Sequence, residues 1–215
     1  MQTKDCTLKC YYIYHTPKSN SMECLPSQSF EELLSRFIKS REFQFTHNAL
    51  VADINILVES VSLASEQQKP VFIRALYKEF FSMVEANLYL INQFNPYDGY
   101  SDKDTIVTKF KKTYRKHAED FKKAELHKKY QSSAFRHFLT TVYKRHDFTH
   151  PKGRPSLKAL YDDFLKLQDV FETYRVHINA LMTNVGFELR LSLTSDEANH
   201  LLAKLISEDS RLNPS

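Results

Sequence analysis

One six-residue segment, Arg145-His146-Asp147-Phe148-Thr149-His150, places a guanidinium and two imidazoles close together in the chain. A histidine imidazole can take up and release a proton near neutral pH. An arginine guanidinium stays cationic and can hold a phosphate oxygen bidentately while negative charge develops on it. These residue types together suit proton transfer at a phosphate ester.

The segment lies where a helix should end. Apolar spacing predicts a helix over residues 131–146, and it places Arg145 and His146 at the end of its inward face. Pro151 restricts the preceding residue, His150, to extended backbone, so the helix should stop before it. We therefore expect an arginine, a polar neighbour and a histidine to gather where a helical bundle turns.

The elements around this turn are expected to be helices, which makes the fold class mainly α. The chain has 215 residues and only 3 glycines, too few for the many tight turns of a β-sandwich or barrel. No GxGxxG or GxxxxGK[ST] motif occurs, which argues against nucleotide binding of the Rossmann or Walker kind.

Capping signals and apolar periodicity predict where the helices begin and end. Ser29 with Glu32 opens a first helix, and Thr194 with Glu197 opens a short terminal one. The helices predicted between these signals cover 45–64, 70–94, 101–127 (with Ser101 and Asp104 as the cap), 131–146 and 156–184.

In two segments, apolar and polar residues alternate in a manner typical of strands. They are LKCYYIYHT at 8–16 and FELRLSL at 187–193, and we expect them to pair because a lone strand leaves its backbone groups unsatisfied. The predicted organisation is a single domain over 1–215. It has a helical core at 70–184 and peripheral extensions at 1–26 and 186–215.

The segment Arg145–His150, with four residues between its arginine and its last histidine, resembles the signature of the HEPN superfamily. That signature is an arginine, a polar residue and then a histidine four to six residues after the arginine, at the close of one core helix and before the next. The resemblance covers about 70–184 and implies a HEPN-like antiparallel helical bundle, with the small two-stranded β appendage outside it.

The resemblance implies a metal-independent endoribonuclease with no cofactor, in which the RNA 2′-hydroxyl is the nucleophile. Arg145, His150 and His146 would be catalytic, with Asp147 in a supporting role. Glu85, beside the apolar stripe of the helix at 70–94, either faces the motif and pairs with Arg145 or points to water. Such enzymes act as toxins or defence effectors, so an antitoxin or other regulatory protein is a further expected partner.

In such ribonucleases two protomers share one cleft, so the resemblance also implies a homodimer. Tyr143 and Phe148 bracket Arg145 and are the aromatic residues available for that contact, unless their rings complete the core of the monomer instead.

Charge is distributed unevenly. Residues 103–158 hold 16 Lys or Arg and 5 Asp or Glu, a net +11, so the rest carries −7 because the whole chain is +4. Such a stretch either contacts phosphate or is a solvated helix face. The expected RNA-binding residues are Lys111, Lys112, Lys116, Lys152 and Arg154.

Three other interpretations stay open. The first is a non-catalytic HEPN module for dimerisation or protein interaction. The second is an unrelated helical adaptor, and the third is a zinc site. The zinc site would use Cys6, Cys10, His15 and Cys24, although their spacing is irregular. We expect His117, His127 and His137 at the surface or an interface.

The N-terminal sequence has no apolar signal-peptide region, and no apolar run reaches 18 residues. Three cysteines are a poor basis for disulfides. We therefore expect a cytoplasmic protein without a membrane partner.

Overall fold

The computed structural model describes residues 30–150, 160–183, 185 and 194–212, which form helices joined by turns and loops, with no strand among them. This confirms the mainly α fold class. The two predicted strands, and the four residues of the alternative zinc site, lie outside the described residues. The helices are α1 (Phe30–Leu63), α2 (Lys69–Phe94), α3 (Ile106–Asp120), α4 (Ala124–Ser133), α5 (Phe135–Thr149), α6 (Tyr161–Met182) and α8 (Ser195–Leu212).

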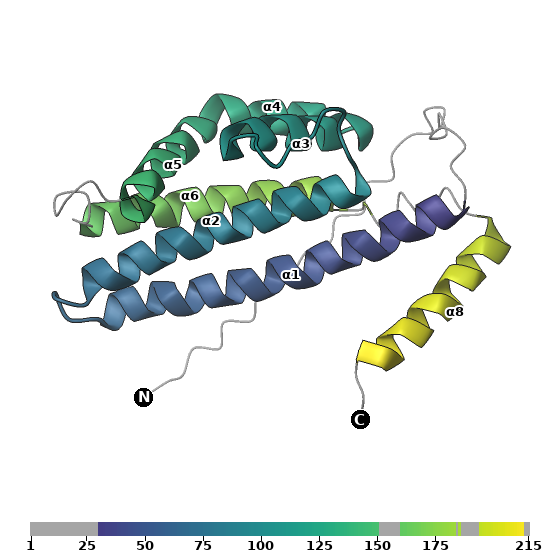
Figure 1. Cartoon of the computed structure of the whole chain (residues 1–215), viewed down its shortest axis with the longest axis horizontal. Helices are drawn as coiled ribbons and strands as arrows, with labels where there is room; N and C mark the ends of the chain where they lie inside the picture. The colour runs from purple at the N-terminus through teal and green to yellow at the C-terminus, as the bar shows by residue number, and fades with distance from the viewer. Residues whose placement is uncertain (1–29, 151–159, 184, 186–193, 213–215) are drawn as a thin grey trace, which may run out of the picture.

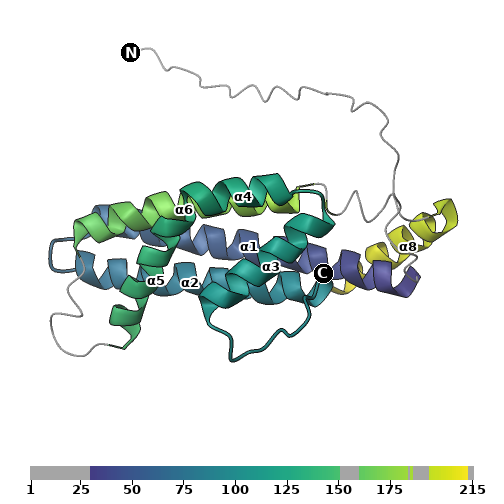
Figure 2. The same cartoon turned by 90° about the horizontal axis from the view of Figure 1, so that it is seen from above.

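Helix α2 is the centre of the bundle. It packs against α1, α3, α5 and α6, and Figure 1 shows α2 and α6 between α1 on one side and α3, α4 and α5 on the other. Figure 2 shows α5 crossing obliquely over α2 and α6. The end of α5, which carries the candidate residues, is therefore held on a platform made by other helices.

Helices α1 and α2 form an antiparallel hairpin, and α1 differs from the prediction. Two helices were predicted, one from Ser29 and one over 45–64, but a single helix runs from Phe30 to Leu63. Ser40, Phe43 and His47 are buried in the segment between the two predictions. Their helical spacing continues the buried face, and no glycine or proline interrupts it, so nothing ends the helix there.

The predicted helix over 101–127 is also wrong at both ends. Thr105, not Ser101, caps α3, because its hydroxyl oxygen accepts a hydrogen bond from the Thr108 N–H at 3.2 Å. The helix ends at Asp120 in a Schellman turn, in which Lys122 has a positive φ of 55°. Lys123 then donates from its ammonium to the Leu181 carbonyl at 2.7 Å, which ties this turn to α6.

The predicted helix over 131–146 is divided at Ala134 into α4 and α5 and extends to Thr149. The change of direction lets Tyr130 and Phe135, on either side of the break, both contact the buried ring of Phe110 on α3. The ring centroids lie 6.0 and 5.2 Å from that of Phe110. Phe138, one turn further along α5, lies 4.6 Å from the same ring. Aromatic packing therefore decides where the chain turns.

A chain of hydrogen bonds crosses this aromatic core. The side-chain amide of Asn87 on α2 is fully buried, and its nitrogen lies 3.1 Å from Nδ1 of His47 on α1. The same amide donates to the Tyr174 hydroxyl on α6 at 3.0 Å, and that hydroxyl lies 2.6 Å from the Tyr114 hydroxyl on α3. Four helices are thus joined by polar groups that have no access to water.

Two of the three histidines expected at the surface are buried, which corrects that expectation. His117 and His127 are buried, whereas His137 is exposed. His127 Nδ1 lies 3.2 Å from Nε2 of His177 on α6, and the His177 ring stacks on Tyr130 at 4.1 Å. Because these imidazoles have partners inside the core, they form part of the packing between α4 and α6.

Helix α8 lies apart from the bundle and meets α1 near its start, where the rings of Phe30 and His200 are 5.3 Å apart (Figure 1). The predicted cap is confirmed, since the Thr194 N–H donates to the Glu197 carboxylate at 2.7 Å. The helix is 18 residues long, not short. No helix in the described part of the chain is long and apolar enough to cross a membrane.

We expect the buried histidines to make the fold sensitive to acid. Burial lowers the pKa of His117 and of His177 to about 3, and that of His127 to about 4. The unfolded chain takes up these protons near pH 6.5, so the free energy of unfolding falls as the pH falls from about 6.5 to about 4. Each of His117 and His177 should contribute a loss of about 1 kcal/mol between pH 7 and pH 5.5, measured by urea unfolding.

The matched variants are His177→Phe and His137→Gln. His177→Phe keeps the stack on Tyr130 and should reduce the loss between pH 7 and pH 5.5. His137→Gln changes an exposed imidazole and should leave that loss unchanged. An equal loss in both variants would contradict the assignment to the buried histidines.

Candidate functional site

The segment Arg145–His150 forms the last turn of α5 and its C-cap. The helix ends at Thr149, and the His150 N–H donates to the His146 carbonyl at 2.9 Å. The Thr149 hydroxyl donates back to the Arg145 carbonyl at 3.0 Å. The helix therefore ends immediately before His150, as Pro151 predicted.

Arg145 is held by helix α2. Its Nη2 donates to Oε1 of Glu85 at 3.0 Å, so the pairing with Glu85, one of two alternatives from the sequence, is the one that forms. The guanidinium also lies over the buried ring of Phe81, 5.5 Å from its centroid. The Nε atom is buried and has no hydrogen-bond partner among the described residues. Arg145 is thus oriented by one ion pair and one cation–π contact.

His146 and His150 form an exposed pair beside it. Both side chains are open to solvent, and their ring centroids lie 5.0 Å apart. Asp147, between them in sequence, is exposed and makes no ion pair with a described residue. Two imidazoles one helical turn apart can serve as a proton donor and a proton acceptor to one bound molecule.

Arg145 and His150 do not lie on the same side of α5. Five residues at 100° each place them about 140° apart around the helix axis. Arg145 contacts α2, whereas His150 lies on the solvent side with Tyr143, which precedes it by seven residues. The end of α5 therefore presents its guanidinium and its imidazoles in different directions.

The two aromatic residues expected at a dimer contact have different surroundings. Tyr143 is 73% exposed, but Phe148 is only 4% exposed, and its ring packs edge-on against Tyr77 of α2 at 5.1 Å. Phe148 therefore completes the core of the chain and is unavailable as an exposed contact, which corrects that expectation. Only Tyr143 remains open to a partner.

The three described lysines proposed for RNA do not gather at this turn. Lys112 and Lys116 each have a carboxylate nearby, at 3.7 Å from Asp104 and 2.5 Å from Asp120. Lys111 lies over the Phe135 ring, at the start of α5, about 15 Å along that helix from Arg145 at 1.5 Å per residue. Lys152 and Arg154 lie outside the described residues.

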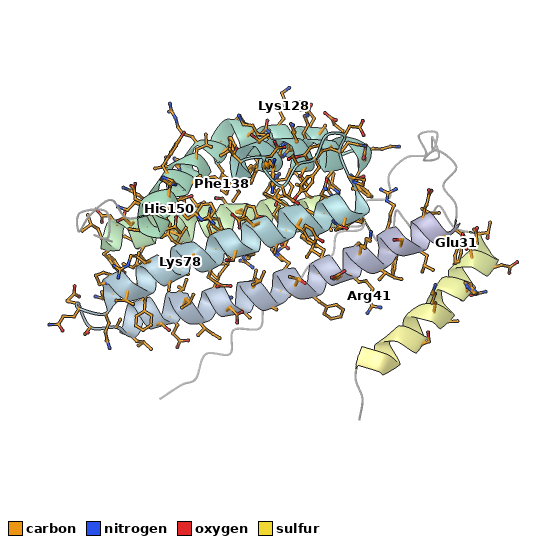
Figure 3. The ribbon with its side chains drawn as sticks, in the orientation of Figure 1. Glu31, Arg41, Lys78, Lys128, Phe138 and His150 are labelled. Carbon is orange, nitrogen blue, oxygen red and sulfur yellow. The ribbon has the colours of Figure 1, made fainter. Side chains whose placement is uncertain are left out.

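Figure 3 shows that a basic residue of α4 also lies away from the Arg145–His150 turn. It labels Lys128 on the outer side of α4, at the top, and His150 to the lower left, beside α5. The described basic side chains between residues 103 and 150 therefore lie along α3, α4 and α5, and they are not collected around one histidine.

A second ion pair, not predicted from the sequence, positions the end of α5. Lys144 Nζ lies 3.2 Å from Oδ2 of Asp163, in the first turn of α6, and 5.1 Å from the centroid of the Phe148 ring. Asp163 also accepts a hydrogen bond from the Leu160 N–H at 2.9 Å and so caps α6. The sequence placed the start of this helix at residue 156, seven positions before Asp163, so it did not identify Asp163 as a cap.

Among the described residues no group of three or more His, Cys, Asp or Glu side chains is arranged to hold a metal ion. Comparison with family models, curated proteins and solved structures finds no match for this chain. The resemblance to HEPN proteins therefore rests on the sequence motif alone.

We expect the Arg145–Glu85 pair to contribute little to stability. The side chains are 30% and 50% exposed, and ion pairs of this kind contribute about 0.2–1 kcal/mol. A double-mutant cycle with Arg145→Ala and Glu85→Ala, read by urea unfolding, should give a coupling free energy in that range. The exposed pair Arg175–Glu172 on α6 is the matched control. A coupling above about 2 kcal/mol would show that Arg145 is required for folding.

Proposed function

We propose that this chain is a metal-independent endoribonuclease of HEPN type. Its catalytic residues are Arg145 and His150, with His146 beside them. The observation that carries the proposal is the exposed imidazole pair at the end of α5, next to an arginine that Glu85 and Phe81 hold in place. The proposal includes a cytoplasmic setting and a role as a toxin or defence effector under a regulatory protein.

The reaction requires only proton transfer and charge stabilisation. The 2′-hydroxyl loses a proton to one imidazole, and the 2′-oxygen then forms a bond to phosphorus while the bond from phosphorus to O5′ breaks. The second imidazole donates a proton to O5′. The products are a 2′,3′-cyclic phosphate and a 5′-hydroxyl, and no metal is needed for this step.

Arg145 would stabilise the charge that develops on the phosphate oxygens. Its Nη2 is engaged by Glu85, which fixes the plane of the guanidinium, and half of the Glu85 side chain is open to solvent. Asp147, at the exposed end of the helix, would act on the orientation or charge of the adjacent imidazoles.

The separation of Arg145 and His150 around α5 supports a homodimer. A guanidinium and an imidazole about 140° apart on one helix do not face the same phosphate. A second chain related by a two-fold axis beside the motif would bring the arginine of one protomer toward the histidines of the other. Isologous pairing is the commonest symmetry of soluble oligomers.

We expect Arg145→Ala and His150→Ala each to reduce RNA cleavage by at least 100-fold, because each removes a group that acts on the scissile phosphate. Cleavage of a fluorescently labelled RNA, with analysis of the product ends, measures this. His137→Ala is the matched control, since it removes an exposed imidazole from the same helix. Both catalytic variants should unfold within about 1 kcal/mol of the parent chain.

EDTA should not change the rate. Cleavage at full rate by either catalytic variant would overturn the assignment, and loss of activity with EDTA, restored by a divalent cation, would indicate a metal-dependent nuclease instead.

Mixing variants tests the shared cleft. Arg145→Ala chains and His150→Ala chains should each be inactive, and their mixture should regain about a quarter to a half of the parent activity, because heterodimers contain one complete pair. Light scattering over a dilution series gives the stoichiometry. Cleavage at full rate by a monomer would exclude the homodimer.

A non-catalytic interaction module is the second candidate. Glu85 neutralises much of the charge of Arg145, and Tyr143 is exposed on the solvent side of the same helix, both of which suit a protein contact. A chain that forms dimers through this surface but leaves RNA intact would support this candidate.

A further inference from the structure

Three exposed residues of different chemistry lie in one line along α5. Arg136, Tyr143 and His150 are spaced seven residues apart, so each lies within about 20° of the next around the helix axis. All three are open to solvent. The line presents a guanidinium, an aromatic ring and an imidazole in that order.

Tyr143 is the most exposed Phe or Tyr side chain in the described part of the chain, at 73%. It makes no hydrogen bond and no ring or cation–π contact with a described residue. A core ring would be packed, as Phe138 and Phe148 of the same helix are. The described contacts of the fold therefore do not explain an aromatic side chain at position 143.

The spacing of the line suits a nucleic-acid strand. Seven helical residues rise about 10 Å, which matches about three stacked nucleotides at 3.4 Å each. A base can stack on an exposed aromatic ring in a sequence-independent manner, and a cation can hold the backbone on either side. Lys111, whose ammonium lies over the Phe135 ring, adds a second cation near the Arg136 end of the line.

We propose that Tyr143 is a stacking platform for a base of single-stranded RNA. This base lies about three nucleotides from the phosphate at His150, and Arg136 holds the backbone beyond it. The proposal rests on the proposed function for the identity of the scissile phosphate, but the stacking contact itself does not require cleavage. It names the substrate as an unpaired strand, because bases within a duplex are not free to stack on a side chain.

Binding is measured with a fluorescein-labelled oligonucleotide of six to ten nucleotides, fully 2′-O-methylated so that it cannot be cleaved. Fluorescence anisotropy of the 215-residue chain at fixed salt gives the dissociation constant. Tyr143→Ala should weaken binding by roughly 10-fold, whereas Tyr143→Phe, which keeps the ring, should change it by less than about 2-fold.

Phe45→Ala is the matched control. Phe45 is an exposed aromatic side chain (64%) on α1, which lies on the other side of α2 from α5 (Figure 1), and its removal should leave binding unchanged. Arg136→Ala should weaken binding and reduce its dependence on salt, because one phosphate contact is lost.

An abasic scan gives the position of the stacked base. Removal of the base that stacks should weaken binding to the parent chain and not to Tyr143→Ala, because both changes remove the same contact. A fully paired RNA duplex should bind both chains equally.

The outcomes separate this proposal from the proposed function. Suppose that Arg145→Ala and His150→Ala retain cleavage but Tyr143→Ala loses affinity for single-stranded RNA. The stacking proposal is then supported, and the catalytic assignment of Arg145 and His150 is wrong. If Tyr143→Ala binds the oligonucleotide as tightly as the parent chain, the platform is wrong. It is also wrong if Tyr143→Ala converts a dimer into a monomer in light scattering, because the ring would then belong to a subunit interface.

Discussion

The bundle depends on one buried amide. Asn87 lies in the middle of α2 and has no access to water, so its polar atoms must find partners inside the core or destabilise the fold by several kcal/mol. It finds them on α1 and α6, through His47 and the Tyr174 hydroxyl, and Tyr174 reaches Tyr114 on α3. Because these contacts need the four side chains within hydrogen-bond distance, they hold the four helices in register.

The aromatic core packs between the helices that these hydrogen bonds hold in register. Rings from α3, α4 and α5 surround Phe110, and the breaks at 121–123 and Ala134 let short helices turn around it. The same packing places α5 across α2. Arg145 therefore contacts Glu85 and Phe81 of α2. Lys144 forms an ion pair with Asp163 of α6. The candidate site is thus the end of a helix whose position is fixed by contacts on two neighbours. A rigid support of this kind is what proton transfer to a bound phosphate ester requires.

The position of a residue around the axis of α5 decides whether its side chain faces α2 or solvent. Arg145 and Phe148 face α2, and Tyr143, His146 and His150 face solvent, although all five belong to two helical turns. An arginine held against the bundle and imidazoles open to solvent are suited to different parts of one reaction. The proposed homodimer and the proposed stacking platform both follow from this division of the helix surface.

The sequence by itself determined the helical class, the extent of α2, the cap at Thr194 and the end of α5 before Pro151, because these depend on interactions between residues at most four positions apart. It could not determine that α1 is continuous, that Ala134 divides a helix, or that His117, His127 and Phe148 are buried. It also left two orientations open for Glu85. These features depend on partners about 20 to 70 residues away, as in Phe110 with Tyr130 and Arg145 with Glu85. An apolar or ionisable residue is compatible with core and surface alike, and only the packing of distant helices decides which of the two it occupies.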